Sequence, residues 1–326
     1  MEKDEKKAIQ KDKPIDEAAQ LKRQKARTEK VNEGINELLL WIKDIFRGGL
    51  LTIPEKQNSL FENISRRMID AQAPGLAAQL KDLGNMNYFS EGWESLFLEK
   101  ILRLYLLLKG YQNSLSQDSL LQEDLRSLIG FTQNQEDLKN KEGIKDKWVV
   151  LAKQTMEEEQ LLVERNWLYG IKTKQYALIL QFYVRNQVPA FTFTAGSLYD
   201  ACLVFFNSTV PLRAIIKESN ISQTRMVPEG IKNWKEVIEL QTSRNSRYPF
   251  LDSYPFIVDA LKPVLINNQW WLEDTEKNIM PVTRDYAGIW KLLSISGGES
   301  KSISLLSNTD TFIPLGIWNN NEYKSF

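Results

Sequence analysis

The chain has 326 residues, with 42 Lys or Arg and 42 Asp or Glu, so its formal net charge is zero. It contains no histidine and a single cysteine, Cys202, which excludes Ser-His-Asp and Cys-His nucleophile pairs, imidazole metal ligands, an internal disulfide and a thiolate zinc site. We therefore expect no bound zinc and no cofactor, and the chemistry left open is that of carboxylates, lysines or a carboxylate-held Mg²⁺.

The N-terminal segment is strongly charged. The first 30 residues hold ten Lys or Arg, seven Asp or Glu and no aromatic residue. This composition is typical of a solvated helix start or a tail, and we assign residues 1–26 to a charged tail or linker. A basic arm that binds nucleic acid is the alternative, although the seven acidic residues argue against it.

Helical periodicity follows from about residue 27 to residue 110, where apolar side chains recur at three- and four-residue steps. Gly48-Gly49 ends the first helix, Pro54 can open the second at its first turn, and Pro74-Gly75 breaks the pattern again. The predicted helices cover residues 27–47, 54–73, 76–83, 93–109 and 120–129, and a polar, linker-like stretch follows at 132–146.

The strongest apolar run, residues 96–108, is 13 residues long and contains Glu99, Lys100 and Arg103. A membrane-spanning helix needs about 20 apolar residues, so we expect a buried helix here. With one cysteine and no targeting segment in the sequence, we expect a cytoplasmic protein.

The period of the pattern changes near residue 147. Short runs rich in aromatic and aliphatic side chains alternate with polar turns, which predicts antiparallel strands and one amphipathic helix over residues 229–242. The predicted strands cover residues 148–152, 160–169, 175–184, 202–206, 212–217, 264–266, 270–273, 279–282, 290–295, 303–306 and 312–317. The turns between them include Asn267-Asn268, Gly297-Gly298 and residues 319–321.

These patterns predict an α+β fold, in which a helical N-terminal half packs on a β-rich, antiparallel C-terminal half. We place the α-helical domain at residues 27–145 and the β-rich domain at residues 146–326. A chain of this length has room for about two domains.

One polar cluster has the pattern of a binding site. Arg66, Arg67, Asp70 and Gln72 lie in RRMIDAQAPGL, just before the predicted helix break. On a helix, Arg66 and Asp70 are four residues apart and share a face, while Arg67 and Asp70 are three apart. These residues are candidates for a polar binding patch, but an ion pair that ties the two helices together is the interpretation that we favour.

Three other features are better explained without a functional site. Glu157-Glu158-Glu159 on an extended chain would point to alternating faces, which favours a hairpin turn over a metal site. Cys202 lies in an apolar strand pattern with no histidine to activate it, so we expect a buried, inert thiol. The nine tryptophans lie mostly inside apolar runs, which favours core positions over a stacking platform for nucleic acid.

Several stretches of the chain resemble the region that follows the zinc finger in bacterial SWIM zinc-finger proteins. They keep the family's order from about residue 14 to the end, and RMIDAQAPGL is the most specific of them. The stretches are GINELLLWIKDIFRGGL, RRMIDAQAPGLAAQLKDL, YALILQF, SLYDACLVFFNSTVPLRAII and WKLLSISGG.

The resemblance implies a non-enzymatic interaction or adaptor module. The family is similar to a component of bacterial gene clusters that also encode MoxR-type AAA+ ATPases and von Willebrand factor A proteins, so these are the expected protein partners. The finger itself binds zinc through three Cys and one His, which this sequence lacks, and no catalytic residue is implied. A nucleic-acid-associated regulator that uses the basic N-terminal arm is the alternative.

Overall fold

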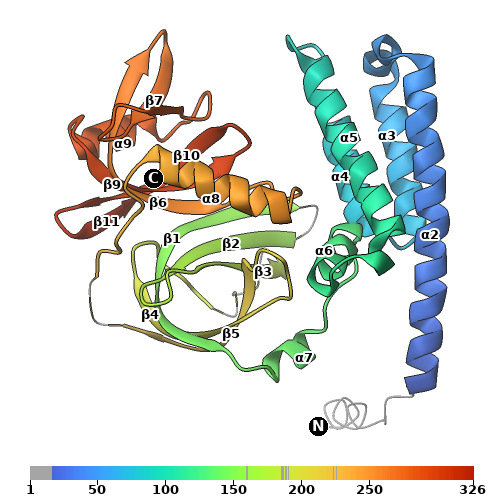
Figure 1. Cartoon of the computed structure of the whole chain (residues 1–326), viewed down its shortest axis with the longest axis horizontal. Coiled ribbons are helices and arrows are strands. Elements are labelled where there is room, and N and C mark those ends of the chain that lie inside the picture. The colour runs from blue at the N-terminus through green and yellow to red at the C-terminus, as the bar shows by residue number, and fades with distance from the viewer. Residues whose placement is uncertain are drawn as a thin grey trace. The chain divides into compact units, whose positions relative to one another are not determined.

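The computed structural model describes residues 17–158, 161–184, 187, 189, 191–222, 224 and 226–326. The chain divides into two compact units, Met1–Thr132 and Gln133–Phe326. The first is helical and the second is rich in strands, which confirms the predicted α+β fold (Figure 1). Most of the expected charged tail lies outside the described residues, and the remainder, from residue 17, is the start of the first helix.

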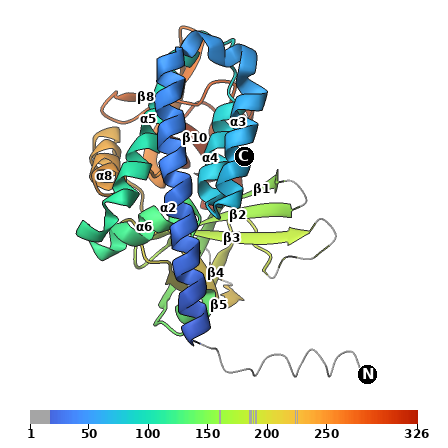
Figure 2. The ribbon, with the colours of Figure 1, turned by 90° about the vertical axis from the view of Figure 1, so that its right-hand side faces the viewer.

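Five helices build the part of the first unit that the structure describes. They are α2 (Glu17–Gly48), α3 (Ile53–Asp70), α4 (Pro74–Gly84), α5 (Trp93–Gln112) and α6 (Ser119–Ile129), with short 3₁₀ turns at η2 (Leu50–Thr52) and η3 (Ser114–Ser116). The long helix α2 lies against α3 and α5 (Figure 2). None of the described helices combines the length and the apolar character needed to cross a membrane.

The helix ends follow the glycines and prolines of the sequence. Gly49 has a φ of 80° after α2, and Gly130 has a φ of 116° after α6, a conformation that glycine adopts without strain. Pro54 and Pro74 stand in the first turns of α3 and α4, where a missing N–H costs nothing. The apolar positions of α3 at three- and four-residue steps, with Met68 and Ile69 at the end, predict a buried Ile69. This prediction is wrong, because the Ile69 side chain is 50% exposed.

The second unit begins before the predicted domain boundary. Its first element is the short helix α7 (Gln135–Lys139), which lies in the stretch expected to be a linker. The side chains of Gln133 and Lys141, on either side of α7, donate to Asn207 at 3.0 and 2.8 Å. These bonds tie the stretch to the β-rich unit.

Five strands form a closed barrel in this unit. They are β1 (Ile144–Glu158), β2 (Leu161–Gly170), β3 (Tyr176–Val184), β4 (Leu198–Phe205) and β5 (Arg213–Ile221). Their order is β1-β2-β3-β5-β4, with β4 back against β1, and every pair is antiparallel except β3 with β5.

Six further strands form a second sheet in the order β11-β10-β9-β6-β7-β8. They are β6 (Pro255–Ile266), β7 (Gln269–Glu273), β8 (Ile279–Pro281), β9 (Lys301–Asn308), β10 (Thr311–Asn319) and β11 (Glu322–Ser325). Tight turns with positive φ join two of the hairpins, at Asn267-Asn268 and Asn320-Asn321. Asparagine tolerates this conformation, so both predicted turns are confirmed.

Two helices accompany this sheet: α8 (Trp234–Arg247), which was predicted, and α9 (Ile289–Ser296). The strand predicted over residues 290–295 is wrong, because that segment is α9. Ile289 and Leu292 are buried one turn apart, whereas Trp290 is 71% exposed. Gly297-Gly298 therefore ends a helix in left-handed conformation instead of joining two strands.

One core joins the barrel to the second sheet. The outer side of β2 and β3 contributes Trp167, Tyr169 and Tyr176, and these pack in the same buried cluster as Trp234 and Phe312. The tryptophans are thus mostly core residues, as predicted, with Trp290 the clear exception. The barrel encloses a separate, smaller core of its own.

Candidate functional site

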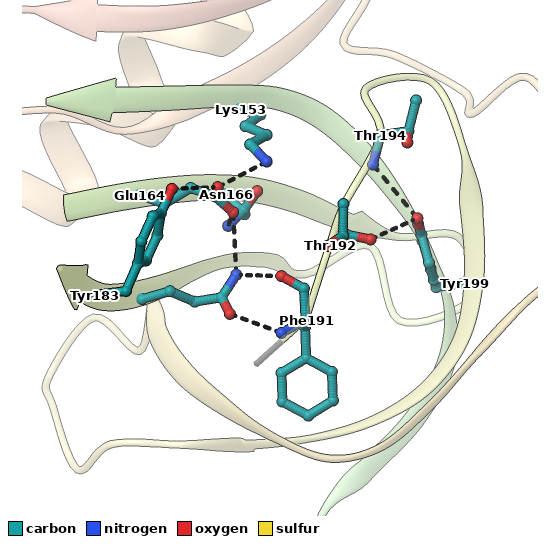
Figure 3. Close-up of polar contacts among 9 residues, drawn as sticks. Lys153, Glu164, Asn166, Tyr183, Phe191, Thr192, Thr194 and Tyr199 are labelled. Atoms are coloured by element: carbon teal, nitrogen blue, oxygen red, sulfur yellow. Dashed lines mark hydrogen bonds and ion pairs between the residues drawn. The ribbon is translucent and has the colours of Figure 1, made fainter. Parts of the chain in front are cut away.

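A polar cluster fills one end of the barrel. Its members are Lys153, Glu164, Asn166, Gln181 and Tyr183, which we call the barrel-mouth cluster (Figure 3). Strand register places them on one face, because Lys153 lies opposite Asn166 on the neighbouring strand and Glu164 lies opposite Gln181. Further along the same strands, the inward positions are apolar and form the barrel core.

An irregularity in β1 explains how a lysine reaches the inside of the barrel. The register with β2 shifts between Val150 and Ala152. Val150 points into the barrel core, whereas both Leu151 and Ala152 pack in the core outside it. The extra residue reverses the alternation of the strand, so Lys153 follows on the inner face.

The carboxylate of Glu164 is the centre of the cluster, and it is completely buried. Lys153 Nζ lies 2.7 Å from Glu164 Oε2, and the Tyr183 hydroxyl donates to the same oxygen at 3.2 Å. Glu164 Oε1 accepts from Asn166 Nδ2 at 2.8 Å and from Gln181 Nε2 at 3.0 Å (Figure 3). A buried charge is stable only when it is paired and hydrogen-bonded in this way.

The cluster also holds the segment that leads from β3 to β4. Gln181 Nε2 donates to the carbonyl of Phe191 at 2.8 Å, and the Phe191 N–H donates to Gln181 Oε1 at 2.9 Å. On the far side, the Tyr199 hydroxyl donates to the Thr192 carbonyl and accepts from the Thr194 N–H, both at 3.3 Å. The ring of Phe191 points away from the polar cluster (Figure 3).

These contacts describe a structural carboxylate and not a free acid or base. Both oxygens of Glu164 are engaged by donors, and water does not reach them. Asn166 Oδ1 is buried without a hydrogen-bond partner in the described part of the chain. Among the described residues, no three Asp, Glu or Cys side chains gather where they could hold a metal ion.

A groove of about 860 Å³ opens beside the cluster, where β3 and β5 separate. We call it the β3–β5 groove. The two strands pair only at Leu178 with Arg213 and at Ile179 with Ala214. The groove is lined by residues 179–183 of β3, residues 214–218 of β5, and Gln135, Lys139, Gln187, Pro189 and Phe191.

Apolar side chains stand exposed along the outer face of the same strands. Phe182 is 55% exposed and Val184 is 44% exposed, although both belong to a regular strand. Leu161 lies opposite Val184 on β2 and is also exposed, as is Met156 on β1. Of these side chains, Phe182 also lines the groove. Exposed apolar side chains that gather on one surface are typical of sites where another molecule binds.

The four site residues predicted from the sequence lie in the helical unit, and all are exposed. Arg66 pairs with Glu62 within α3, and Arg67 pairs with Glu37 of α2. The carboxylate of Asp70 has no ion pair or hydrogen bond with any residue in the described ranges, so the expected pairing with arginine is not found. The arginines therefore connect to glutamates, and one of these pairs joins two helices.

The neighbouring backbone has a structural role. Gln72 has a φ of 60° at the break between α3 and α4, and its carbonyl accepts from Arg27 Nη2 at 3.3 Å. The same guanidinium donates to the Gly130 carbonyl at 3.0 Å. A Cβ atom on Gly75 would lie 2.1 Å from the Leu128 carbonyl oxygen, so only glycine allows α4 to approach the end of α6 this closely.

Sequence reasoning missed the barrel-mouth cluster. Glu164 and Asn166 alternate with Trp167 in an ordinary strand pattern, which indicates a solvent-facing side for the polar residues. The available signal was that Glu164 and Asn166 occupy alternate positions of one predicted strand, and that the next predicted strand also contains a polar residue, Gln181. Cys202 is buried and has no disulfide partner, as predicted, and lies outside the cluster.

The comparisons with known proteins concern the helical unit. Residues 26–129 match the family model of the SWIM-associated four-helix bundle domain. No curated protein and no solved structure matches the chain. The matched segment runs from α2 to the end of α6, so the similarity to the SWIM-associated four-helix bundle domain covers the helices of the first unit.

Proposed function

We propose that this chain is a non-enzymatic protein-interaction module of a SWIM-family system, and that its β-rich unit binds a protein partner at the β3–β5 groove. The observation that carries the proposal is the row of exposed apolar side chains, Phe182 and Val184 among them, beside that groove. Polypeptide partners cover such surfaces more readily than small polar ligands do. The saturated carboxylate of Glu164 supports a structural role for the neighbouring polar groups.

The partners that we propose are a MoxR-type AAA+ ATPase and a von Willebrand factor A protein. The support is the SWIM-associated bundle, because the SWIM family resembles a component of gene clusters that encode both. An adaptor of this kind needs a folded anchor and a surface for a second protein. The helical bundle and the groove of the β-rich unit are candidates for these two parts.

A nucleic-acid-associated regulator is the second candidate, and the closed five-stranded barrel favours it. One class of five-stranded barrel binds oligonucleotides on the face of its strands 2 and 3. Here the central part of that face carries Trp167 and Tyr176, which are buried against the second sheet. These two rings are therefore covered, and Phe182 is an exposed aromatic residue on this face. Single-stranded nucleic acid stacks successive bases on several aromatic rings, which the described part of this face does not offer. We favour the protein-binding function for this reason.

The experiment is a binding titration of the full chain against the purified ATPase and von Willebrand factor A protein from the same genome. We expect one of them to bind, and Phe182→Asp to weaken the complex at least tenfold by placing a charge in the apolar row. The matched control is Phe89→Asp, because Phe89 is 86% exposed but lies in the helical unit. It should leave the affinity unchanged.

The two functions give opposite results. Binding of neither protein, or equal losses from the Phe182 and Phe89 variants, would contradict the proposal. Tight binding of oligo-dT at physiological salt, lost on substitution of basic residues near the N-terminus, would instead support the nucleic-acid function.

A further inference from the structure

Within the residues that the structure describes, the edge of β3 that faces the groove has no strand partner beyond Ile179. On its other edge, β3 pairs with β2 along its whole length, up to Val184 opposite Leu161. On the groove side, pairing with β5 stops at Ile179 and Ala214. The last stretch of β3 is therefore the free edge of a sheet.

The direction of the backbone groups follows from one hydrogen bond. The N–H of Leu178 donates to the Leu212 carbonyl at 2.7 Å, so the N–H and C=O groups of Leu178 point toward β5. Because strand residues alternate, those of Phe182 point the same way, into the opening. The Val184 carbonyl is already used, since it accepts from the Gln187 N–H at 2.8 Å. Phe182 thus presents a donor and an acceptor in strand geometry.

The side chains around this edge define what could lie beside it. Phe182 projects on the outer face, next to other exposed apolar residues. Ala214 and Ile216 line the groove on the opposite wall. Lys139, Lys217 and Glu218 supply two positive charges and one negative charge. An incoming strand would place alternate side chains over Phe182 and toward Ile216. A polynucleotide has no alternating N–H and C=O groups to match the edge, so the backbone of β3 favours a polypeptide.

We infer that the partner segment is an extended peptide that adds to β3 as a strand, with apolar residues at alternate positions. The inference rests on the proposed protein-binding function and makes it specific. Main-chain hydrogen bonds to Phe182 give the affinity, and the apolar row gives the selectivity, as in other cases of strand addition. Free edges of this kind pair readily with a second chain.

The test begins with random dodecapeptides displayed on phage and selected against the full chain. The selected peptide is synthesised with a fluorophore, and its affinity is measured for the wild type and for variants. Phe182→Pro removes the N–H that faces the groove but no bond to β2, so the barrel should fold. We expect it to weaken binding about tenfold. Phe182→Ala keeps the N–H and should weaken it less, and the control Phe89→Ala, at an exposed position of the helical unit, should have no effect.

A measurement on the wild type keeps the test valid even if Phe182→Pro disturbs the fold. Hydrogen–deuterium exchange at the Phe182 amide should slow when the peptide binds. In addition, N-methylation of alternate peptide residues should weaken binding about tenfold, because each removes one donor to the edge. Unchanged exchange at Phe182, or wild-type affinity in Phe182→Pro, would overturn the inference. So would oligo-dT that displaces the peptide and protects the same amide.

The failure of this inference can be distinguished from the failure of the proposed function. If the ATPase or the von Willebrand factor A protein binds Phe182→Pro as tightly as the wild type, the inference is wrong and the function stands. If neither protein binds but a selected peptide protects the Phe182 amide, the inference stands and the proposed partners are wrong.

Discussion

Replacing Lys153 by methionine tests whether the barrel-mouth cluster holds a buried charge in place. The substitution keeps most of the aliphatic stem but leaves the fully buried carboxylate of Glu164 without its cation. Breaking a buried ion pair from one side costs about 3–5 kcal/mol. Since the Lys153 side chain is 32% exposed, and three neutral donors remain, we expect a smaller loss of about 2–3 kcal/mol. In a unit of this size, that corresponds to a fall of about 4–12 °C in melting temperature.

The double variant separates the charge from the packing. Glu164→Gln in the Lys153→Met background removes the stranded charge, and the Tyr183 hydroxyl can turn from donating to accepting. We expect the double variant to be about 1–2 kcal/mol more stable than Lys153→Met alone. The matched control is Lys174→Met, which breaks an exposed pair with Glu229 at 2.9 Å and should leave the melting temperature unchanged.

Thermal and urea unfolding of the four proteins decide the matter. Equal stability of Lys153→Met and Lys174→Met would show that the cluster carries no buried charge. A double variant less stable than the single one would show that its packing, and not its charge, is what matters.

Three further predictions concern stability. Gly75→Ala should lower the free energy of unfolding by about 1–3 kcal/mol, because the new Cβ would lie 2.1 Å from the Leu128 carbonyl oxygen. Gly48→Ala is the control and should be tolerated, because its Cβ would meet nothing within 4 Å; urea unfolding compares the two. Burial alone would raise the pKa of Asp274, but hydrogen bonds to its carboxylate bring the pKa below its usual value. Its contribution is therefore present at pH 7 and lost as the pH falls through that lowered pKa, so Asp274→Asn should be destabilising at pH 7 and nearly neutral at pH 2 in melts at both pH values. Asp70→Ala should leave the melting temperature unchanged, since the carboxylate is exposed. A fall of several degrees would contradict this and support the ion pair expected from the sequence.

The helical unit could be predicted because its signals are local. Glycines and prolines mark the helix ends, and the apolar stripe repeats over many turns. The prediction failed at α9, where a run of eight residues is too short for periodicity to separate a helix from a strand. The prediction for Ile69 failed for a different reason. The buried face of α3 ends with Met68, and the apolar Ile69 next to it lies on the exposed side of the helix.

The barrel and its cluster could not be predicted, because they depend on contacts between distant segments. Closure requires β3 to pair in parallel with β5, at Ile179 with Ala214, and no turn signal encodes such a pair. Polar residues at alternate positions of a strand are normally on its solvent face, so Glu164 has the sequence pattern of a surface residue. In the closed barrel, β2 is buried on both faces, and Glu164 lies inside.

The polar cluster and the free edge belong to the same strand, and this links stability to binding. Gln181 and Tyr183 point inward to Glu164, while Phe182 between them presents its backbone groups to the groove. Because Gln181 is held by Glu164 and by both backbone groups of Phe191, β3 stays extended after β5 has left it. A strand that is already extended loses less conformational entropy when a partner adds to it. Loosening the cluster should therefore weaken the binding of an added strand, even though Lys153 Nζ reaches Glu164 and not the groove.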